Sequence, residues 1–156
     1  MMTLRRIRLL FWALLCTGLI AGGPTGAMAL DSNTCVGFSA AEVPQPTVNC
    51  ESGAESAADC TVDAGTANGF AIYIDNCARC HGHGVGPKVG LAPNLADRPI
   101  NYEQIHFILY HGHDEDLGVM PSWRGNCDVI PRIDEIYLYL KARADGSLPP
   151  GRPKSQ

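Results

Sequence analysis

The sequence predicts an all-α domain of three main helices behind an irregular N-terminal arm. Three segments repeat apolar residues at the 3.6-residue period of a helix, and glycine and proline separate them. No segment alternates apolar and polar residues as a half-buried strand does, so we expect strands to be absent or trivial. With 156 residues, of which 46% are apolar and 18% charged, the chain can form one globular domain with some additional segments.

The first 29 residues have the organisation of a secretory signal peptide. Three arginines precede an apolar run over residues 9–21, glycines break the run, and Ala27-Met28-Ala29 supplies a small-residue cleavage site. The apolar run is shorter than the roughly 20 residues that cross a bilayer. We therefore expect export to the periplasm, cleavage after Ala29, and no stable membrane insertion afterwards.

Residues 30–65 are predicted to form an acidic, irregular arm. Residues 30–75 contain seven acids and no Lys or Arg, and the arm is rich in Ser, Ala, Pro and Gly. A solvated flexible arm explains this acidity, and a docking surface is the alternative. The net charge of −4 and the lack of any long Lys/Arg run argue against nucleic-acid binding.

The helical domain is expected over residues 66–148. Thr66 can cap the first helix, in which Phe70, Tyr73, Ile74 and Cys77 share one face, and the glycines after His81 can end it.

Two more helices are expected in this domain. Asn101 can cap a second helix over residues 101–111, which Gly112 can end. A third helix is expected over residues 133–144, and residues 149–156 are expected to be a flexible tail. Three such helices make a small core, so a disulfide, a metal or another apolar group must complete it.

The motif Cys77-Ala78-Arg79-Cys80-His81 predicts that this group is one covalently bound haem. In C-x-x-C-H the two thiols add to the haem vinyl groups, and the adjacent histidine reaches the iron. A redox disulfide, a zinc site that includes His83, and a plain disulfide framework are the alternatives. The redox hypothesis lacks the βαβ unit in which a C-x-x-C redox motif is expected. The zinc hypothesis lacks a second pair of ligands at the spacing found in zinc fingers.

Met120 is the predicted second axial ligand of the iron. It is the only methionine left after the expected cleavage, and Pro121 stiffens the loop that would present its thioether. His111 and His113 remain alternatives at the end of the second helix. His83 is too close to His81 to reach the opposite haem face, and His106 is expected to have a surface or packing role.

Cys77 to His81, the segment Leu91-Ala92-Pro93-Asn94-Leu95, and Gly118 to Pro121 before an amphipathic C-terminal helix resemble the class I c-type cytochromes. The likeness covers residues 66–148 and implies that family's fold. It also implies that the Pro93 carbonyl orients His81, which fixes the ring and makes its other nitrogen a better donor. In that family the first and last helices cross near the haem, and this implies a contact of Gly69-Phe70 with Ile136-Tyr137.

A narrower resemblance concerns Met120-Pro-Ser-Trp123 and the segment from Tyr139 to Gly146. These residues are similar to periplasmic cytochromes that accept electrons from PQQ-dependent methanol or other alcohol dehydrogenases. The resemblance implies an electron carrier, not an enzyme, with a dehydrogenase as donor and a cytochrome or terminal oxidase of the respiratory chain as acceptor. The alternatives are a peroxidase-like haem enzyme or sensor with His111 or His113 as the distal group, and a binding domain without cofactor.

The remaining cysteines are expected to form two disulfides. Every pairing of Cys35, Cys50, Cys60 and Cys127 joins Cys127 to the arm, and the sequence does not choose among the three connectivities. Free thiols or a second metal site are the alternative.

Charged and indole groups are expected at the rim of the haem. Trp123 could donate to a haem propionate, and Arg98 or Arg124 could balance propionate charge, although surface or packing roles would suit all three. Arg79 and Lys88 are expected with Arg98 near the exposed haem edge.

Overall fold

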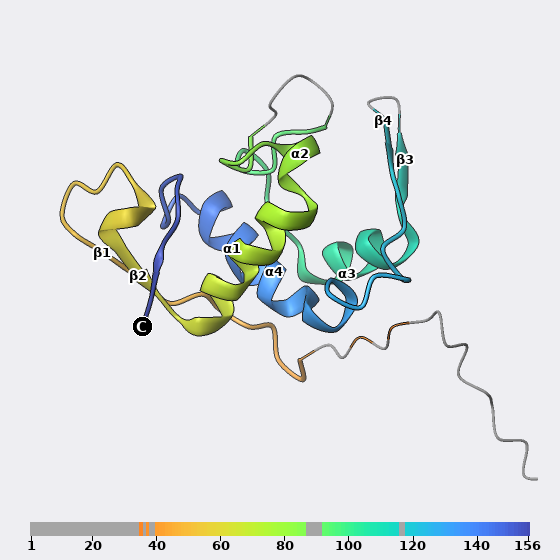
Figure 1. Ribbon diagram of the computed structural model, residues 1–156, viewed down its shortest axis with the longest axis horizontal. Coiled ribbons are helices and arrows are strands. Elements are labelled where there is room, and N and C mark those ends of the chain that lie inside the picture. Colours follow the sequence, from red (N-terminus) through yellow and green to blue (C-terminus); the bar gives the residue numbers. More distant parts are fainter. Residues whose placement is uncertain (1–34, 36, 38–39, 87–91, 116–117) are drawn as a thin grey trace, which may run out of the picture.

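The computed structural model describes residues 35, 37, 40–86, 92–115 and 118–156. The expected signal peptide, Leu91 and Lys88 lie outside these residues. Four α-helices dominate the described part, and their bounds are α1 (Ala64–Asn76), α2 (Ala78–His81), α3 (Tyr102–His111) and α4 (Ile133–Ala144). The prediction of an all-α domain is therefore confirmed, with a few short strands that the sequence did not predict (Figure 1).

Helix α1 begins three residues earlier than expected because Asp63, not Thr66, caps it. The Asp63 carboxylate accepts from the Thr66 N–H at 2.8 Å and from the Thr47 N–H at 2.7 Å. Partial burial raises the pKa of Asp63, but these hydrogen bonds outweigh burial and hold the pKa below its ordinary value. The expected single helix is interrupted at Cys77, so α2 is a separate turn that Gly82 ends at φ +76°.

Helices α3 and α4 lie where the periodicity predicts them. Asn101 caps α3 by accepting from the Gln104 N–H at 2.8 Å, and Gly112 ends it at φ +81°. Helix α4 follows the short 3-10 helix η2 (Ile130–Arg132) and ends at Asp145.

Helices α1 and α4 cross at Gly69, where a Cβ atom would lie only 1.8 Å from the Glu135 carbonyl oxygen. The aromatic contact at this crossing involves Tyr139, whose ring centroid lies 5.5 Å from that of Phe70. The expected partner Tyr137 instead packs against Tyr102 at 5.0 Å. The family resemblance thus gave the right helix pair and the right glycine but the wrong tyrosine.

The arm and the C-terminal segment form a small sheet that the sequence did not predict. Strand β1 (Val48–Cys50) pairs antiparallel with β2 (Cys60–Val62), which pairs in parallel with β5 (Lys154–Ser155). The 3-10 helix η1 (Ala57–Asp59) lies between β1 and β2. Residues 149–156, expected as a flexible tail, therefore contribute a strand, because β5 takes the free edge of β2. Residues of the expected irregular arm are also buried, among them Ala57, Cys60 and Val62.

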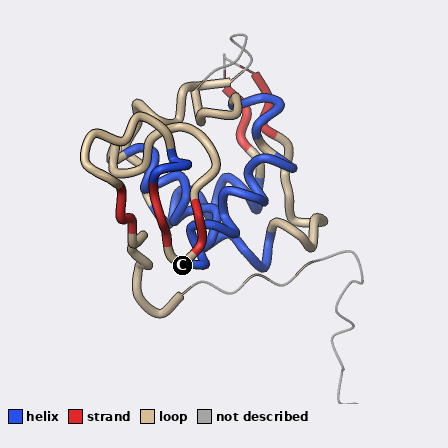
Figure 2. The backbone as a smooth tube through the Cα atoms, turned by 60° about the vertical axis from the view of Figure 1, so that its left-hand side comes forward, coloured by secondary structure: helices blue, strands red, loops and turns tan. Residues whose placement is uncertain are grey.

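A β-hairpin lies on the other side of the helices. Its strands are β3 (His113–Glu115) and β4 (Gly118–Met120), and His113 faces Met120 in the register. Figure 2 shows the hairpin and the sheet on opposite sides of the helical core. Within the described ranges, no helix has the length and apolar character needed to span a membrane.

The two disulfides join Cys35 to Cys127 and Cys50 to Cys60. The first disulfide links the arm to the loop before α4, and all three possible connectivities had joined Cys127 to the arm in this way. The second closes the loop between β1 and β2.

Candidate haem site

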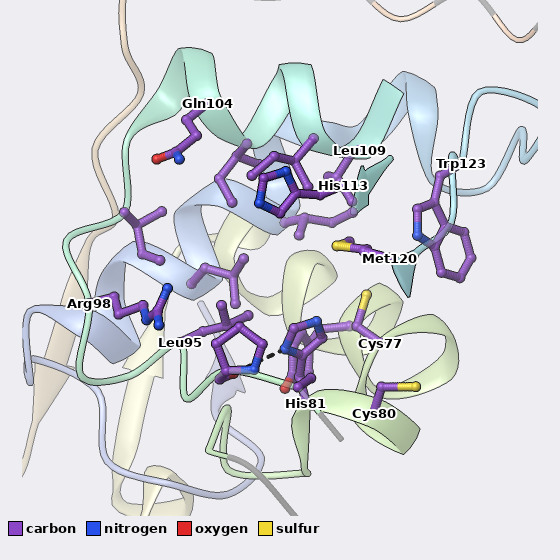
Figure 3. A pocket seen from close by; sticks show the side chains of 18 of the residues that line it. Cys77, Cys80, His81, Leu95, Arg98, Gln104, Leu109, His113, Met120 and Trp123 are labelled. Atoms are coloured by element: carbon purple, nitrogen blue, oxygen red, sulfur yellow. Dashed lines mark hydrogen bonds between the residues drawn. The ribbon is translucent and has the colours of Figure 1, made fainter. Parts of the chain in front are cut away.

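A cavity of about 280 Å³ lies between α2, α3, α4 and the hairpin (Figure 3). The C-x-x-C-H motif forms one wall, and the hairpin residues His113, Val119 and Met120 form part of another. The remaining lining is mostly apolar and includes Ala92, Leu95, Ile100, Ile105, Ile108, Leu109, Ile136 and Leu140. An apolar cavity of this kind suits a large, flat, largely apolar group, which would complete the small core.

Cys77 and Cys80 both line the cavity, and neither is in a disulfide. Burial, with a smaller contribution from nearby Cys80, raises the pKa of the Cys77 thiol to about 12. A C-x-x-C redox centre needs a thiol of lowered pKa, so this environment argues against the redox alternative. In the described part of the chain no three His, Cys, Asp or Glu side chains are grouped as a zinc site requires.

His81 is buried, and its ring is oriented by the carbonyl of Pro93. The Nδ1 atom lies 3.3 Å from the Pro93 oxygen, so an N–H at Nδ1 donates to that carbonyl. Burial lowers the pKa of His81 more than this hydrogen bond raises it, which favours the neutral ring. A neutral ring protonated at Nδ1 keeps the lone pair of Nε2 for a metal.

Met120 and His113 also line the cavity, but they belong to the hairpin, whereas His81 belongs to α2. Figure 3 shows the Met120 sulfur and the His113 ring directed into the cavity from the hairpin. Met120 is half-buried, whereas His113 is exposed.

The other histidines lie away from the cavity. The ring of His111 contacts Phe107 and Tyr110, and His106 Nε2 lies 2.9 Å from an Asp134 carboxylate oxygen. His83 borders a shallow surface hollow beside Phe70. Of the predicted alternatives to Met120, only His113 therefore has a place in the cavity wall.

The rim of the cavity carries the groups that an acidic cofactor edge needs. Within the described residues, the buried Trp123 Nε1 has no hydrogen-bond partner, so an acceptor on a bound group would satisfy it. Arg79 and Arg98 line the cavity, and no Asp or Glu of the described chain does. Arg124 does not line it. The donor set, the apolar interior and this buried N–H together fit a haem.

Sequence reasoning missed several residues of the site. Asn76 and Gln104 line the cavity, but polar residues beside a C-x-x-C-H motif or on a helix give no signal of that placement. The apolar residues of α3 and α4 carried a signal, since their shared helix faces indicate a surface that must be covered.

Comparison with known proteins identifies the family. Residues 64–140 match the family model for cytochrome c oxidase, cbb3-type, subunit III. Cytochrome c-555 of Methylococcus capsulatus is 34% identical over 93 residues, which is 58% of this chain and 72% of that protein. The chain belongs to the c-type cytochromes. It therefore carries covalently bound haem c, and the alternatives of a zinc site and of a domain without cofactor are wrong.

Two further relatives support this assignment. Cytochrome c-553I of Paracoccus denitrificans is 37% identical over 98 residues, which is 59% of this chain and 43% of that protein. The crystal structure of the c-type cytochrome XoxG from Methylobacterium extorquens AM1 has a TM-score of 0.55 and 34% identity, and the likeness covers 62% of this chain and 61% of that chain. The cytochrome thus spans less than two thirds of these two relatives. The predicted class I cytochrome fold is confirmed, and the chain is a small electron-carrying cytochrome.

Proposed function

We propose that this cytochrome is a periplasmic carrier that accepts electrons from a PQQ-dependent alcohol or methanol dehydrogenase and passes them to the respiratory chain. The observation that carries the proposal is the pairing of His81 on one side of the cavity with Met120 on another. A haem held by both has no open coordination position. Such a site changes its oxidation state without binding a substrate.

Each residue of the site has one role in the proposal. Cys77 and Cys80 attach the haem through thioether bonds, and His81 ligates the iron with its ring held by Pro93. Met120 supplies the second ligand, and a thioether raises the reduction potential relative to a second imidazole. When bound, haem supplies a one-electron iron couple. Trp123 donates its indole N–H to a propionate, and Arg98 balances propionate charge.

His113 supports a second candidate function, a haem enzyme or sensor with a non-methionine distal site. It lines the cavity and pairs with Met120 in the hairpin, so an imidazole in the cavity wall could serve as the distal group if Met120 did not bind the iron. A small peroxidase-like activity would need this arrangement in the resting protein. A near-infrared thioether-to-iron band in the oxidised protein argues for the carrier, and its absence argues for the enzyme or sensor.

The choice of donor rests on the family resemblance and on the charges around the cavity. Arg79, Arg98 and Val119 all line the cavity and are exposed, Val119 by 73%. An apolar contact within a basic rim suits an acidic partner surface, and such transient redox interfaces are small and steered by charge. We expect reduction by the dehydrogenase to slow as ionic strength rises.

The test combines purified dehydrogenase, its alcohol and the cytochrome in a stopped-flow measurement. Reduction at a rate that falls with salt, and a weaker salt dependence in Arg79→Gln and Arg98→Gln, supports the proposal. Charge variants at Glu51, Glu55 and Asp59 then ask whether the arm steers docking. These variants are preferable to deleting the arm, because buried Ala57 and Cys60 belong to the core. Failure of the dehydrogenase to reduce the protein at any ionic strength, while another periplasmic donor does, would contradict the donor assignment.

A further inference from the structure

The segment that follows Met120 and leads to α4, residues 121–132, is here called the ligand loop. Its first residues are fixed to the end of α3. The Trp123 N–H donates to the Leu109 carbonyl at 2.8 Å, and the Ser122 hydroxyl donates to the Tyr110 carbonyl at 2.6 Å. Gly112 allows the close approach, because a Cβ there would lie 2.8 Å from the Met120 carbonyl oxygen.

The middle of the ligand loop is fixed to α1 through Asn126. Its Nδ2 donates to the Asn76 side-chain oxygen at 3.3 Å, and Asn76 directly precedes haem-binding Cys77. The Asn126 side-chain oxygen accepts from the Asp128 N–H at 2.9 Å and from the Val129 N–H at 3.2 Å. One amide therefore shapes the loop and joins it to the segment that carries the haem motif.

Two described residues of the arm, Cys35 and Gly37, contact the ligand loop. The Cys35–Cys127 disulfide joins Cα atoms 5.1 Å apart, and the Cys35 N–H donates to the Arg124 carbonyl at 3.2 Å. Gly37 lies so close to Ile130 that a Cβ would approach its carbonyl oxygen to 2.8 Å. Cys35 is only 5% exposed, so this contact is part of the packed structure.

The arm is itself anchored to the helical core beyond the loop. The Ala40 N–H lies 2.8 Å from the Tyr102 hydroxyl on α3 and 3.1 Å from an Asp134 carboxylate oxygen on α4. The Tyr102 hydroxyl donates to Asp134 at 2.7 Å, which joins the same two helices. Cys35 and Gly37 of the arm therefore contact the ligand loop, and Ala40 contacts the helical core.

We propose that the arm, fixed through the Cys35–Cys127 disulfide, is a positioning device that holds Met120 on the iron. The inference rests on the proposed role of Met120 as ligand. An external ligand replaces the thioether only when Met120 moves away together with the ligand loop that directly follows it, so each attachment of the loop lowers the population of this open state. A disulfide between the arm and the loop restricts that movement most strongly, because it is covalent.

The second disulfide provides a matched control. Cys50–Cys60 joins the ends of β1 and β2, and neither cysteine lines the cavity or contacts the ligand loop. Figure 1 shows this sheet on the side of the molecule away from the hairpin that carries Met120. Removal of either disulfide lowers global stability, but only removal of Cys35–Cys127 should affect the ligand loop.

The test measures the affinity of the oxidised holoprotein for imidazole, far below its unfolding temperature, from the loss of the near-infrared band. We expect Cys35→Ala/Cys127→Ala to bind imidazole at least about tenfold more tightly than the wild type, which is 1.4 kcal/mol. Cys50→Ala/Cys60→Ala should change the affinity less than twofold. Equal affinities in both double variants, or a wild-type affinity without Cys35–Cys127, would overturn the proposal.

A second preparation guards against poor haem loading of the first variant. Mature Cys50→Ala/Cys60→Ala holoprotein is treated with a mild reductant, its two released thiols are alkylated, and the iron is reoxidised before the imidazole titration. The same tenfold gain is expected there. The variant Met120→Ala separates the two proposals. If Met120→Ala retains the near-infrared band, Met120 is not the ligand and both proposals fail. If Met120→Ala loses the band but removal of Cys35–Cys127 leaves the imidazole affinity unchanged, only the positioning role of the arm fails.

Discussion

Substitution of Gly69 by alanine tests whether the crossing of α1 and α4 is as close as the structure indicates. The added Cβ would lie 1.8 Å from the Glu135 carbonyl oxygen, 2.5 Å from its carbonyl carbon and 3.1 Å from the Tyr139 Cβ. The first two atoms belong to the backbone of α4, so no side-chain rotation can move them away from the added Cβ. The helices must therefore separate by more than an ångström at their closest point.

The cost follows from the packing that this separation disturbs. Overpacking a well-packed core costs about 1–3 kcal/mol and occasionally more. Here the strain falls on two helix backbones and loosens the contacts of Phe70 and Tyr73 with Tyr139. We expect a loss of about 3 kcal/mol, which for a domain of this size lowers Tm by roughly 10 °C or more.

Thermal unfolding followed by far-ultraviolet circular dichroism of the oxidised holoprotein measures this loss. The control is Gly84→Ala, because the Cβ there would meet only Pro150 at an ordinary 3.8 Å. We expect that variant to stay within about 0.5 kcal/mol of the wild type. If Gly69→Ala is as stable as Gly84→Ala, the close helix crossing is wrong.

Three further predictions follow from particular contacts. The pKa of Asp63 is lower in the folded protein than its unfolded value of 3.8, so the stability that Asp63 contributes is complete above pH 3.8 and is lost as the pH falls below it. Denaturant midpoints of Asp63→Asn should therefore change less with acid pH than those of the wild type. Intact mass spectrometry after alkylation without reductant should find no labelled cysteine in the mature holoprotein, since four cysteines are in disulfides and two in thioethers, and abundant labelled protein would contradict this. Trp123→Phe should retain the near-infrared band but shift the midpoint potential through the lost propionate hydrogen bond, and an unchanged potential would remove Trp123 from the haem contacts.

The sequence predicted the helices whose ends carry their own signals. Asn101 and Gly112 define α3 through a side-chain cap and a left-handed glycine, and both act locally. The break between α1 and α2 at Cys77 has no such local signal, because the flanking residues continue the helical period. Strands of two or three residues are too short to show alternation, so the sheet went unpredicted.

The site shows the same division between local and distant information. The C-x-x-C-H motif is contiguous, so its cysteines and histidine were recognised from the sequence. The contact of Asn126 with Asn76 joins residues 50 positions apart, and nothing near either amide indicates its partner. The choice of Tyr139 over Tyr137 at the helix crossing depended on the rotation of α4, and both tyrosines are buried, so burial alone could not distinguish them.

The most direct measurement of the central claim is the near-infrared spectrum of the oxidised holoprotein in the wild type, Met120→Ala and His113→Ala. Both side chains line the cavity from paired positions of the same hairpin, so His113→Ala is a control for the loss of a side chain at that part of the cavity. We predict the thioether band in the wild type and in His113→Ala, and its loss with a lowered midpoint potential in Met120→Ala. A band that persists in Met120→Ala, or a wild type that lacks it, would contradict the assignment of His81 and Met120 as the two ligands of an electron carrier.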